Sequence, residues 1–451
     1  MTAQQLQEVK SNRYLFQLSW PIFIELILQM LVGNADQIMV SQYSSQSVGA
    51  IGNANQITNL LIISFSVISM ASTILISQYI GSGNKEKVEQ TYTVSLALNL
   101  AFGLLISVIL LFFSKPIFTL MQVPAELIPE TCLYTQIVGG GMIFQAVYLT
   151  YTAFFRSNAM MRLTMAVSVA VNLLNIGGNY LLINGNFGLP ALGVAGAAVS
   201  SVVSRIIGCI LVIILFRKLS GARLSLRHLR PFPKDLTGKL LRIGLPSGGE
   251  NISYNLSQIC IQAICNLLPI YVITTRVYAN MFATFSYLYA SAVAQAAQIV
   301  VGYLMGARMI SDADKTVRKI TSTAVVISLG ISFLVYLLCG PLYSLLTDNP
   351  QIIALAKQIC LIEIALEAGR AVNIALCRAL QAAGDYKFPV VLSLIDVWIV
   401  AVGLGYLLSI VLGWGLIGIW AAMAMDECIR AVVLILRWRG GTWKQKDLLH
   451  G

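Results

Sequence analysis

The chain has 451 residues, enough for about three ordinary domains, but its composition excludes a soluble protein. Hydrophobic residues make up 57% of it and charged residues 11%, whereas soluble domains carry roughly 25% charged residues. The formal net charge is +11, and the basic residues are scattered over many short loops. This charge therefore indicates membrane topology and contact with anionic lipid, and argues against a nucleic-acid partner.

A helix of about 20 apolar residues crosses the hydrocarbon core of a bilayer. Windows of that length predict twelve transmembrane helices, at about residues 16–41, 55–81, 93–114, 131–155, 163–184, 191–216, 241–268, 275–303, 319–340, 355–377, 388–411 and 414–436. Short connections rich in Gly, Pro, Asn and Ser separate them, which is typical of turns and helix caps. The sequence therefore predicts an all-α polytopic membrane protein.

Basic residues favour the even-numbered connections, from Lys85 and Lys87 to Lys387, while the odd-numbered ones hold little more than Lys115 and Arg276. Lys and Arg accumulate on the cytoplasmic side of a membrane. We therefore expect a multi-pass protein of the cell membrane with both termini in the cytoplasm.

Scarce residues recur 225 positions apart in the chain. The pairs are Pro21 with Pro246, Glu25 with Glu250, Gly193 with Gly418, and Arg205 with Arg430. An internal repeat of six helices places two lobes in the same orientation, related by an axis along the membrane normal. We expect an N-terminal lobe over residues 1–216, a basic cytoplasmic linker over 217–240, and a C-terminal lobe over 241–451, with a central cavity between the lobes.

The usual signatures of membrane enzymes and pumps are missing from the sequence. His228 and His450 lie in polar segments without clustered acids, so histidine catalysis and metal binding are not expected. No GxxxxGK[ST] phosphate loop or TVGYG filter occurs, and the eight cysteines show no disulfide or zinc spacing. We predict ion-coupled transport without enzymatic activity or cofactor, the coupling ion being H⁺ or Na⁺.

Asp36 is the leading candidate for the ion-coupling residue. It lies in the apolar segment LVGNADQIMV between Asn34 and Gln37, and no Lys or Arg occurs between Arg13 and Lys85. Burial in a low-dielectric medium favours the protonated carboxyl, which suits a proton carrier, unless a cation pairs with it.

Asn175 and Asn179 lie one turn apart on the fifth predicted helix, so both can face the acid. Val400 and Leu404 stand at the positions 225 residues further on. The polar residues are therefore unevenly divided, and the N-terminal lobe is the predicted ion site.

The other acids within predicted helices are possible accessory sites, and they are Glu25, Glu250, Glu363, Glu367, Asp396, Asp426 and Glu427. Glu363, Glu367 and Arg370 share one helix face, which favours a structural ion pair. Arg430 lies one turn after Asp426 and Glu427, and this spacing likewise favours a structural role for the two acids. For Asp396, which has no partner on its own helix, functional and structural roles both stay open.

Four strings, in this order along the chain, resemble the multidrug and toxic compound extrusion (MATE) family. They are GNADQIMVSQYSSQSVGAIGNA, GSGNKEKV, NLLNIGGNYLLINGNFGLPALGVAGAAVSS and ALQAAGDYKFP. The resemblance covers residues 15–440. It implies two six-helix bundles arranged in a V, and export of organic cations in exchange for protons or sodium.

By resemblance, the family's first-helix acid corresponds to Asp36, its fifth-helix Asn to Asn175, and its sixth-helix Thr to Ser201. Asn179 stands where members with a well-formed N-lobe cation site have an Asp. Losing one carboxylate weakens an oxygen cage for sodium, so we favour the proton. In the second lobe, Tyr254 stands where other members have an acid, one turn after Glu250, so that site is not transferred.

The expected cargo is a lipophilic cation held in the cavity by stacking and cation–π contacts. Candidate cavity residues are Asn34, Gln37, Phe144, Tyr148, Phe154, Phe155 and Tyr254, although the aromatic ones could equally serve in helix packing. Alternatives are a flippase of a lipid-linked intermediate from the same superfamily, or an uncoupled channel or scaffold. We expect a monomer whose partners are small molecules and membrane lipid.

Overall fold

The computed structural model describes residues 3–221 and 224–449, and the chain is 87% helical with no strand in the described part. The first half contains α1 (Ala3–Val9), α2 (Asn12–Tyr43), α3 (Ser45–Ser82), α4 (Lys85–Leu120), α5 (Ile128–Gly140), α6 (Met142–Ser157), α7 (Met161–Leu182) and α8 (Gly193–Leu219). The second half contains α9 (Lys234–Cys265), α10 (Ile270–Gly306), α11 (Ile310–Leu337), α12 (Cys339–Ser344), α13 (Pro350–Ala382), α14 (Lys387–Asp396) and α15 (Gly415–Arg439), with π-helical turns over Val397–Leu404 and Leu407–Val411. The prediction of an all-α fold is confirmed.

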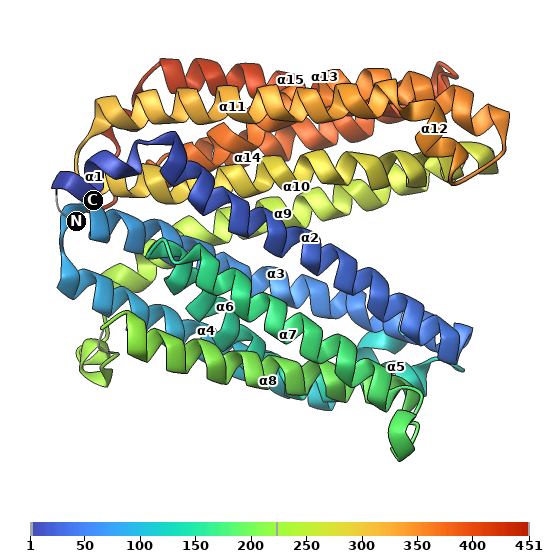
Figure 1. The fold of residues 1–451 in the computed structure, drawn as a ribbon, viewed down its shortest axis with the longest axis horizontal. Helices are drawn as coiled ribbons and strands as arrows, with labels where there is room; N and C mark the ends of the chain where they lie inside the picture. Colours follow the sequence, from blue (N-terminus) through green and yellow to red (C-terminus); the bar gives the residue numbers. More distant parts are fainter. Residues whose placement is uncertain (1–2, 222–223, 450–451) are drawn as a thin grey trace. The chain divides into compact units, whose positions relative to one another are not determined.

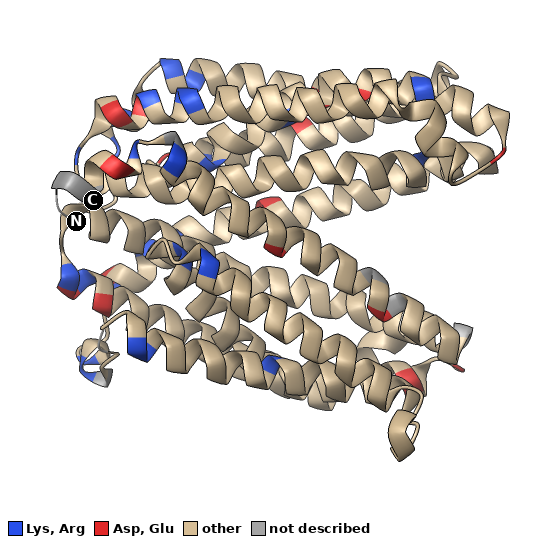
Figure 2. Cartoon of the chain, viewed as in Figure 1, with Lys and Arg blue, Asp and Glu red and all other residues tan. Residues whose placement is uncertain are grey.

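In the described residues, eight helices are long and apolar enough to cross a membrane, and the pair α5 and α6, bent by 48°, makes a ninth. Three more helices, α9, α13 and α15, have membrane length but do not pass the same test. In α13 and α15 the reason is visible in the sequence, because these helices carry the Glu, Asp and Arg residues described below. In the other helices, most charged residues lie near the helix ends, with long uncharged stretches between them (Figure 2).

Helix ends follow local sequence signals. The GSGNKEK connection turns at Gly83, whose φ of +77° is readily adopted by glycine. Asn84 then caps α4 by accepting a hydrogen bond from the backbone N–H of Lys87 at 3.1 Å. In the TDNPQ connection, Asn349 caps α13 in the same way and Pro350 occupies the first turn.

The chain divides into two compact units. The N-terminal unit comprises Ile24–Tyr79 and Asn84–Gly248, and the C-terminal unit comprises Ile80–Gly83, Gly249–Gly451 and the N-terminal segment up to Phe23. Within the first unit α7 packs on α8 and α4 on α5 and α6, while within the second α13 packs on α10, α11 and α15 (Figure 1). The predicted lobe boundaries, with a linker over 217–240, stay a prediction.

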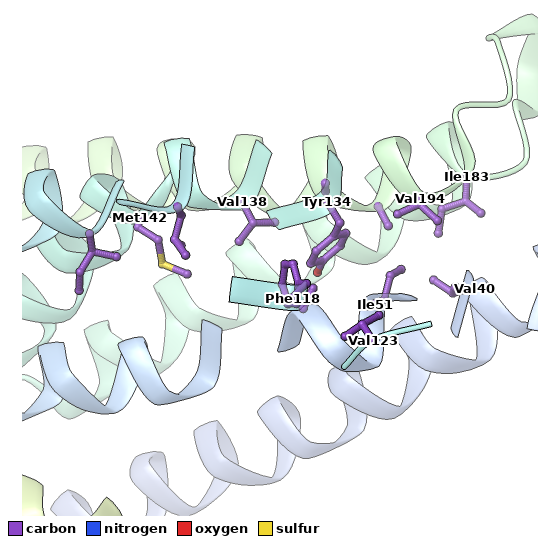
Figure 3. Packing of buried hydrophobic residues seen from close by; sticks show 14 of the residues in the cluster. Val40, Ile51, Phe118, Val123, Tyr134, Val138, Met142, Ile183 and Val194 are labelled. Atoms are coloured by element: carbon purple, nitrogen blue, oxygen red, sulfur yellow. The ribbon is translucent and has the colours of Figure 1, made fainter. Parts of the chain in front are cut away.

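The core of the N-terminal unit is apolar and tightly packed. Figure 3 shows Phe118, Tyr134 and Met142 among its buried side chains, which come from α4, α5 and α6 and meet residues of α2, α3 and α8. In a bilayer, lipid tails are as apolar as these side chains, so helix association depends on close packing and small residues at the contacts.

Gly369 provides such a contact in the C-terminal unit. A Cβ atom at this position of α13 would lie 2.7 Å from the backbone nitrogen of Cys428 on α15. The neighbouring atoms belong to a helix backbone and not to a flexible side chain, so they cannot easily move away. Glycine therefore permits the close approach of the two helices that carry most of the buried charges of this unit.

We predict that Gly369→Ala lowers the free energy of unfolding by about 1–3 kcal/mol, the usual cost of overpacking. The matched control is Gly330→Ala in α11, where a Cβ would meet nothing within 4 Å and the better helix propensity of Ala stabilises by up to about 1 kcal/mol. Thermal unfolding of the two purified variants in one detergent measures the difference. Equal stability would contradict the close approach of α13 and α15.

Candidate functional site

The N-terminal unit contains a cavity of about 740 Å³. Residues of α2, α3, α5, α7 and α8 line it, and all of them belong to this one unit. The lining is rich in amide side chains, namely Gln29, Asn55, Asn59, Asn172, Asn175 and Asn179, with hydroxyls from Tyr134, Ser201 and Ser204. Its volume falls in the range of small-molecule sites, roughly 300–1,000 Å³.

Asp36 of α2 lies in this cavity and is held by an amide of α7. Asn179 is 2% exposed and donates a hydrogen bond from Nδ2 to Oδ1 of Asp36 at 2.7 Å. This contact joins residues 143 positions apart in the chain. All four ion-coupling residues proposed from sequence, Asp36, Asn175, Asn179 and Ser201, line the same cavity.

Asn175 lies between Asp36 and Ser201. With its amide nitrogen turned toward the acid, Asn175 donates to both carboxylate oxygens at 3.2 Å, and its oxygen accepts a hydrogen bond from the Ser201 hydroxyl at 3.2 Å. This orientation satisfies both ends of the amide, which is how amide orientations are assigned. Two amide N–H donors therefore surround the Asp36 carboxylate in the described site.

Arg205 of α8 is the residue that the sequence reasoning missed. It lines the cavity and interacts electrostatically with Asp36. The sequence search for a partner covered only the neighbourhood of Asp36 in the chain, between Arg13 and Lys85, whereas the cation comes from the sixth predicted helix. The repeat was the available signal, because Arg205 matches Arg430, which neutralises acids in the other half.

Arg205 and Asp36 form no direct ion pair in the part of the chain that the structure describes. The Nη1 atom of Arg205 is buried and has no hydrogen-bond partner there, and Oδ1 of Asn179 is likewise unpartnered. A buried guanidinium nitrogen and amide oxygen without partners are costly. Nδ2 of Asn172, another residue of the cavity lining, is unpartnered in the same way.

Glu25, an accessory candidate, has its own partners in the N-terminal unit. Its buried carboxylate accepts a hydrogen bond from Arg156 at 3.0 Å and another from Gln29 at 3.4 Å. Ion pairing of this kind explains how a glutamate that is 2% exposed is tolerated.

The C-terminal unit contains a much larger charge network than the sequence suggested. Arg370 of α13 contacts Glu367, lies 3.6 Å from Glu363, and lies 3.6 Å from Glu427 of α15. Ser286 and Trp420 donate further hydrogen bonds to Glu367 and Glu363, respectively. The predicted ion pairs of Glu363 and Glu367 with Arg370 are present.

Arg430 of α15 completes the network. It contacts Asp426, lies 3.2 Å from Glu427, and lies 3.9 Å from Asp396, which thereby has a partner on another helix. Asn373 adds a hydrogen bond to Glu427 at 2.7 Å. Five buried or half-buried carboxylates therefore surround two arginines here, so the uneven division of polar residues expected from Asn175 and Asn179 does not extend to the charged groups.

Glu250 and Tyr254 lie one turn apart on α9, in the C-terminal unit. Glu250 interacts electrostatically with Arg378 and Arg430. Tyr254 lines a smaller cavity of about 250 Å³ together with Glu363, Arg370, Tyr287 and Trp420.

The structure contradicts part of the predicted aromatic cavity. Phe154 and Phe155 are 0% exposed and pack in a cluster with Tyr92, Tyr151 and Phe216. Their rings fill the contact between helices and present no surface to cargo. An aromatic side chain in a predicted helix has the same sequence pattern whether it packs against another helix or lines a cavity.

Four other cavity candidates belong to the N-terminal unit. Tyr148 lies against Gly208 of α8, at 3.4 Å from the position of a Cβ there, and Phe144 is half-buried. Neither is among the residues that line the 740 Å³ cavity. The side chains of Asn34 and Gln37 lie outside the described part of the structure.

Many helices long and apolar enough to cross a membrane, with a polar cavity among them, are typical of a polytopic membrane transporter. The model of the MatE family matches residues 21–181 and 246–407. The second match begins 225 residues after the first, as the predicted repeat requires. The chain belongs to the MatE family, a family of transporters and not of enzymes.

The similarity of the chain to known proteins supports this family assignment. The chain is 39% identical to the uncharacterized transporter YisQ of Bacillus subtilis, over 96% of this chain and 95% of the relative. It is 24% identical to the probable multidrug resistance protein NorM of Thermotoga maritima, over 99% and 96%. A solved structure of a mutant of the Vibrio cholerae MATE transporter VcmN, 17% identical, superposes with a TM-score of 0.89 over 99% of both chains, which shows the same fold.

We predict that Arg430→Met destabilises the protein by about 3–5 kcal/mol, because it leaves the buried Asp426 and Asp396 without their cation, next to Glu427. Arg439→Met, on the exposed end of the same helix, is the matched control and should leave stability unchanged. Thermal unfolding and yield of monodisperse protein measure both. Wild-type stability of Arg430→Met would show that the network is not structural.

Proposed function

We propose that the protein is a proton-coupled antiporter that exports lipophilic organic ammonium compounds, with Asp36 as the proton-binding residue of the N-terminal unit. The observation that carries the proposal is the position of Asp36, a partly buried carboxylate that faces a cavity large enough for cargo and is held by Asn175 and Asn179. Proton and cargo then compete for one carboxylate, which is the simplest basis for exchange.

The amides around Asp36 suit both protonation states. An amide can donate its N–H to a carboxylate, and after rotation it can accept the proton of a carboxylic acid through its oxygen. The unpartnered Oδ1 of Asn179 is such an acceptor. Protonation therefore needs only side-chain rotation at this site.

The same geometry disfavours sodium. A hard cation prefers several oxygen ligands including full negative charges. Of the described residues that line the cavity, Asp36 is the one acid, two amide N–H groups donate to it, and Arg205 interacts with it electrostatically. A sodium ion bound there would have a single anionic ligand and would be opposed by the charge of Arg205.

Flippase or channel activity finds less support in the site. A flippase for an anionic lipid phosphate favours several basic groups in its cavity, and the described lining contains one arginine. A channel or scaffold needs no buried acid within reach of a cavity. The antiporter accounts for Asp36 and for the amides around it together.

We expect Asp36→Asn to abolish coupled export while the protein still folds, since the amide keeps the shape of the side chain and removes the titrating group. Drug efflux from cells and cation-stimulated proton release from proteoliposomes measure this. The matched control is Asp348→Asn, an exposed acid in the loop before α13, which should export normally. Normal efflux by Asp36→Asn at equal expression would remove Asp36 from the mechanism.

The coupling ion is tested separately in vesicles that contain purified protein. In sodium-free buffer, collapse of the pH gradient should stop transport, and a sodium gradient at equal pH on both sides should not restore it. Export driven by sodium alone would refute proton coupling. It would also require oxygen ligands beyond the single acid that lines the described cavity.

A further inference from the structure

The cavity of the N-terminal unit contains two opposite charges, and the proposed antiport uses only one of them. Asp36 on α2 and Arg205 on α8 are the charged residues among the described residues of its lining. They interact electrostatically without a direct ion pair, and the other polar groups of the lining are amides and hydroxyls. The net formal charge of the lining is therefore zero when Asp36 is ionised.

A cargo with a single positive charge matches only half of this site. Its ammonium group would contact Asp36 and leave Arg205 as an uncompensated charge in a partly buried cavity, and such charges are costly at membrane depth. A cargo with one ammonium and one carboxylate group would give each fixed charge a partner. Charge complementarity of this kind sets specificity more than affinity.

The chemistry of Arg205 supports recognition of a carboxylate. The residue lines the cavity, and its Nη1 has no hydrogen-bond partner in the described part of the structure, so no protein group already occupies this donor. Guanidinium groups present paired N–H donors that match a carboxylate in two parallel hydrogen bonds. Tyr134 is the other charged or ionisable group that interacts with Arg205, and it lies on α5, against the same cavity.

The geometry points to Arg205 as the residue that recognises an anionic group on the cargo, so that the N-terminal cavity prefers zwitterionic ammonium carboxylates over cations that lack the carboxylate. This inference rests on the proposed function for the identity of the cavity as the cargo site. It adds a second anchor to that site, opposite Asp36.

A matched pair of dyes tests the preference directly. One is the rhodamine with a free benzoic acid, and the other is the methyl ester of the same dye, which keeps the ring system and the positive charge but masks the carboxylate. Fluorescence polarisation with purified full-length protein in detergent, at one pH and without a gradient, should give tighter binding of the free acid. Equal or tighter binding of the ester by the wild type would overturn the inference without any variant.

Substitutions of Arg205 then test whether this residue recognises the carboxylate. Arg205→Met should weaken binding of the free acid by roughly tenfold or more, the value of a hydrogen bond to a charged group, and should leave binding of the ester equal or tighter. Arg205→Lys, which keeps the charge but not the paired donors, should keep part of the preference. Arg217→Met, at an exposed position of the same helix, should behave as the wild type.

Other outcomes are equally decisive. An undiminished preference for the free acid in Arg205→Met would show that another group reads the carboxylate, and would refute the role of Arg205. If Arg205→Met binds neither dye and is unfolded by thermal analysis, Arg205→Lys decides the question, because full wild-type preference in a variant without the paired donors would also refute it. Binding is measured without a gradient, so failure here is distinct from failure of proton coupling, which Asp36→Asn tests.

Discussion

The cost of placing charge in hydrocarbon governs the whole structure. A single ionised side chain at the bilayer centre costs about 2.5–3.5 kcal/mol even on the insertion scale. The chain nevertheless carries carboxylates and guanidiniums on α2, α8, α13 and α15. Each unit meets this cost differently. The C-terminal unit packs its charges into direct ion pairs, whereas in the described N-terminal unit Asp36 and Arg205 line one cavity, rich in amides, without a direct ion pair.

This difference separates stability from function. Arg370 and Arg430 have several carboxylates in contact, so their charges are compensated within the protein. Asp36 is held by amides that can rotate, and it has no direct ion pair with Arg205 in the described part of the structure. A charge that already has opposite charges in contact gains little from a ligand, whereas a charge without such a contact gains a partner. The N-terminal unit is for this reason the better binding site.

The sequence predicted the helical fold, the 225-residue repeat and the meeting of Asp36 with Asn175 and Asn179 well. Apolar length and one-turn spacing are local patterns, and the repeat is a match between identical residues. All three can be read from the sequence without knowledge of how the helices pack. The charge partner of Asp36 could not be found in this way, because Arg205 is 169 residues away and only packing decides which face of α8 meets the cavity. Repeat symmetry with Arg430 was the sole indication.

Phe154 and Phe155 illustrate the opposite limit, since an apolar aromatic face has the same pattern whether it packs against helices or against cargo.

The shared arginines of the C-terminal unit have an evolutionary consequence. Arg370 and Arg430 both approach Glu427, and each also contacts other acids, so the loss of either arginine leaves several carboxylates without a cation. Substitutions here are strongly epistatic: a change that is harmful alone becomes tolerable only when a second charge is removed with it. The network is therefore expected to change between related transporters by paired replacement, with opposite charges gained or lost together on α13 and α15.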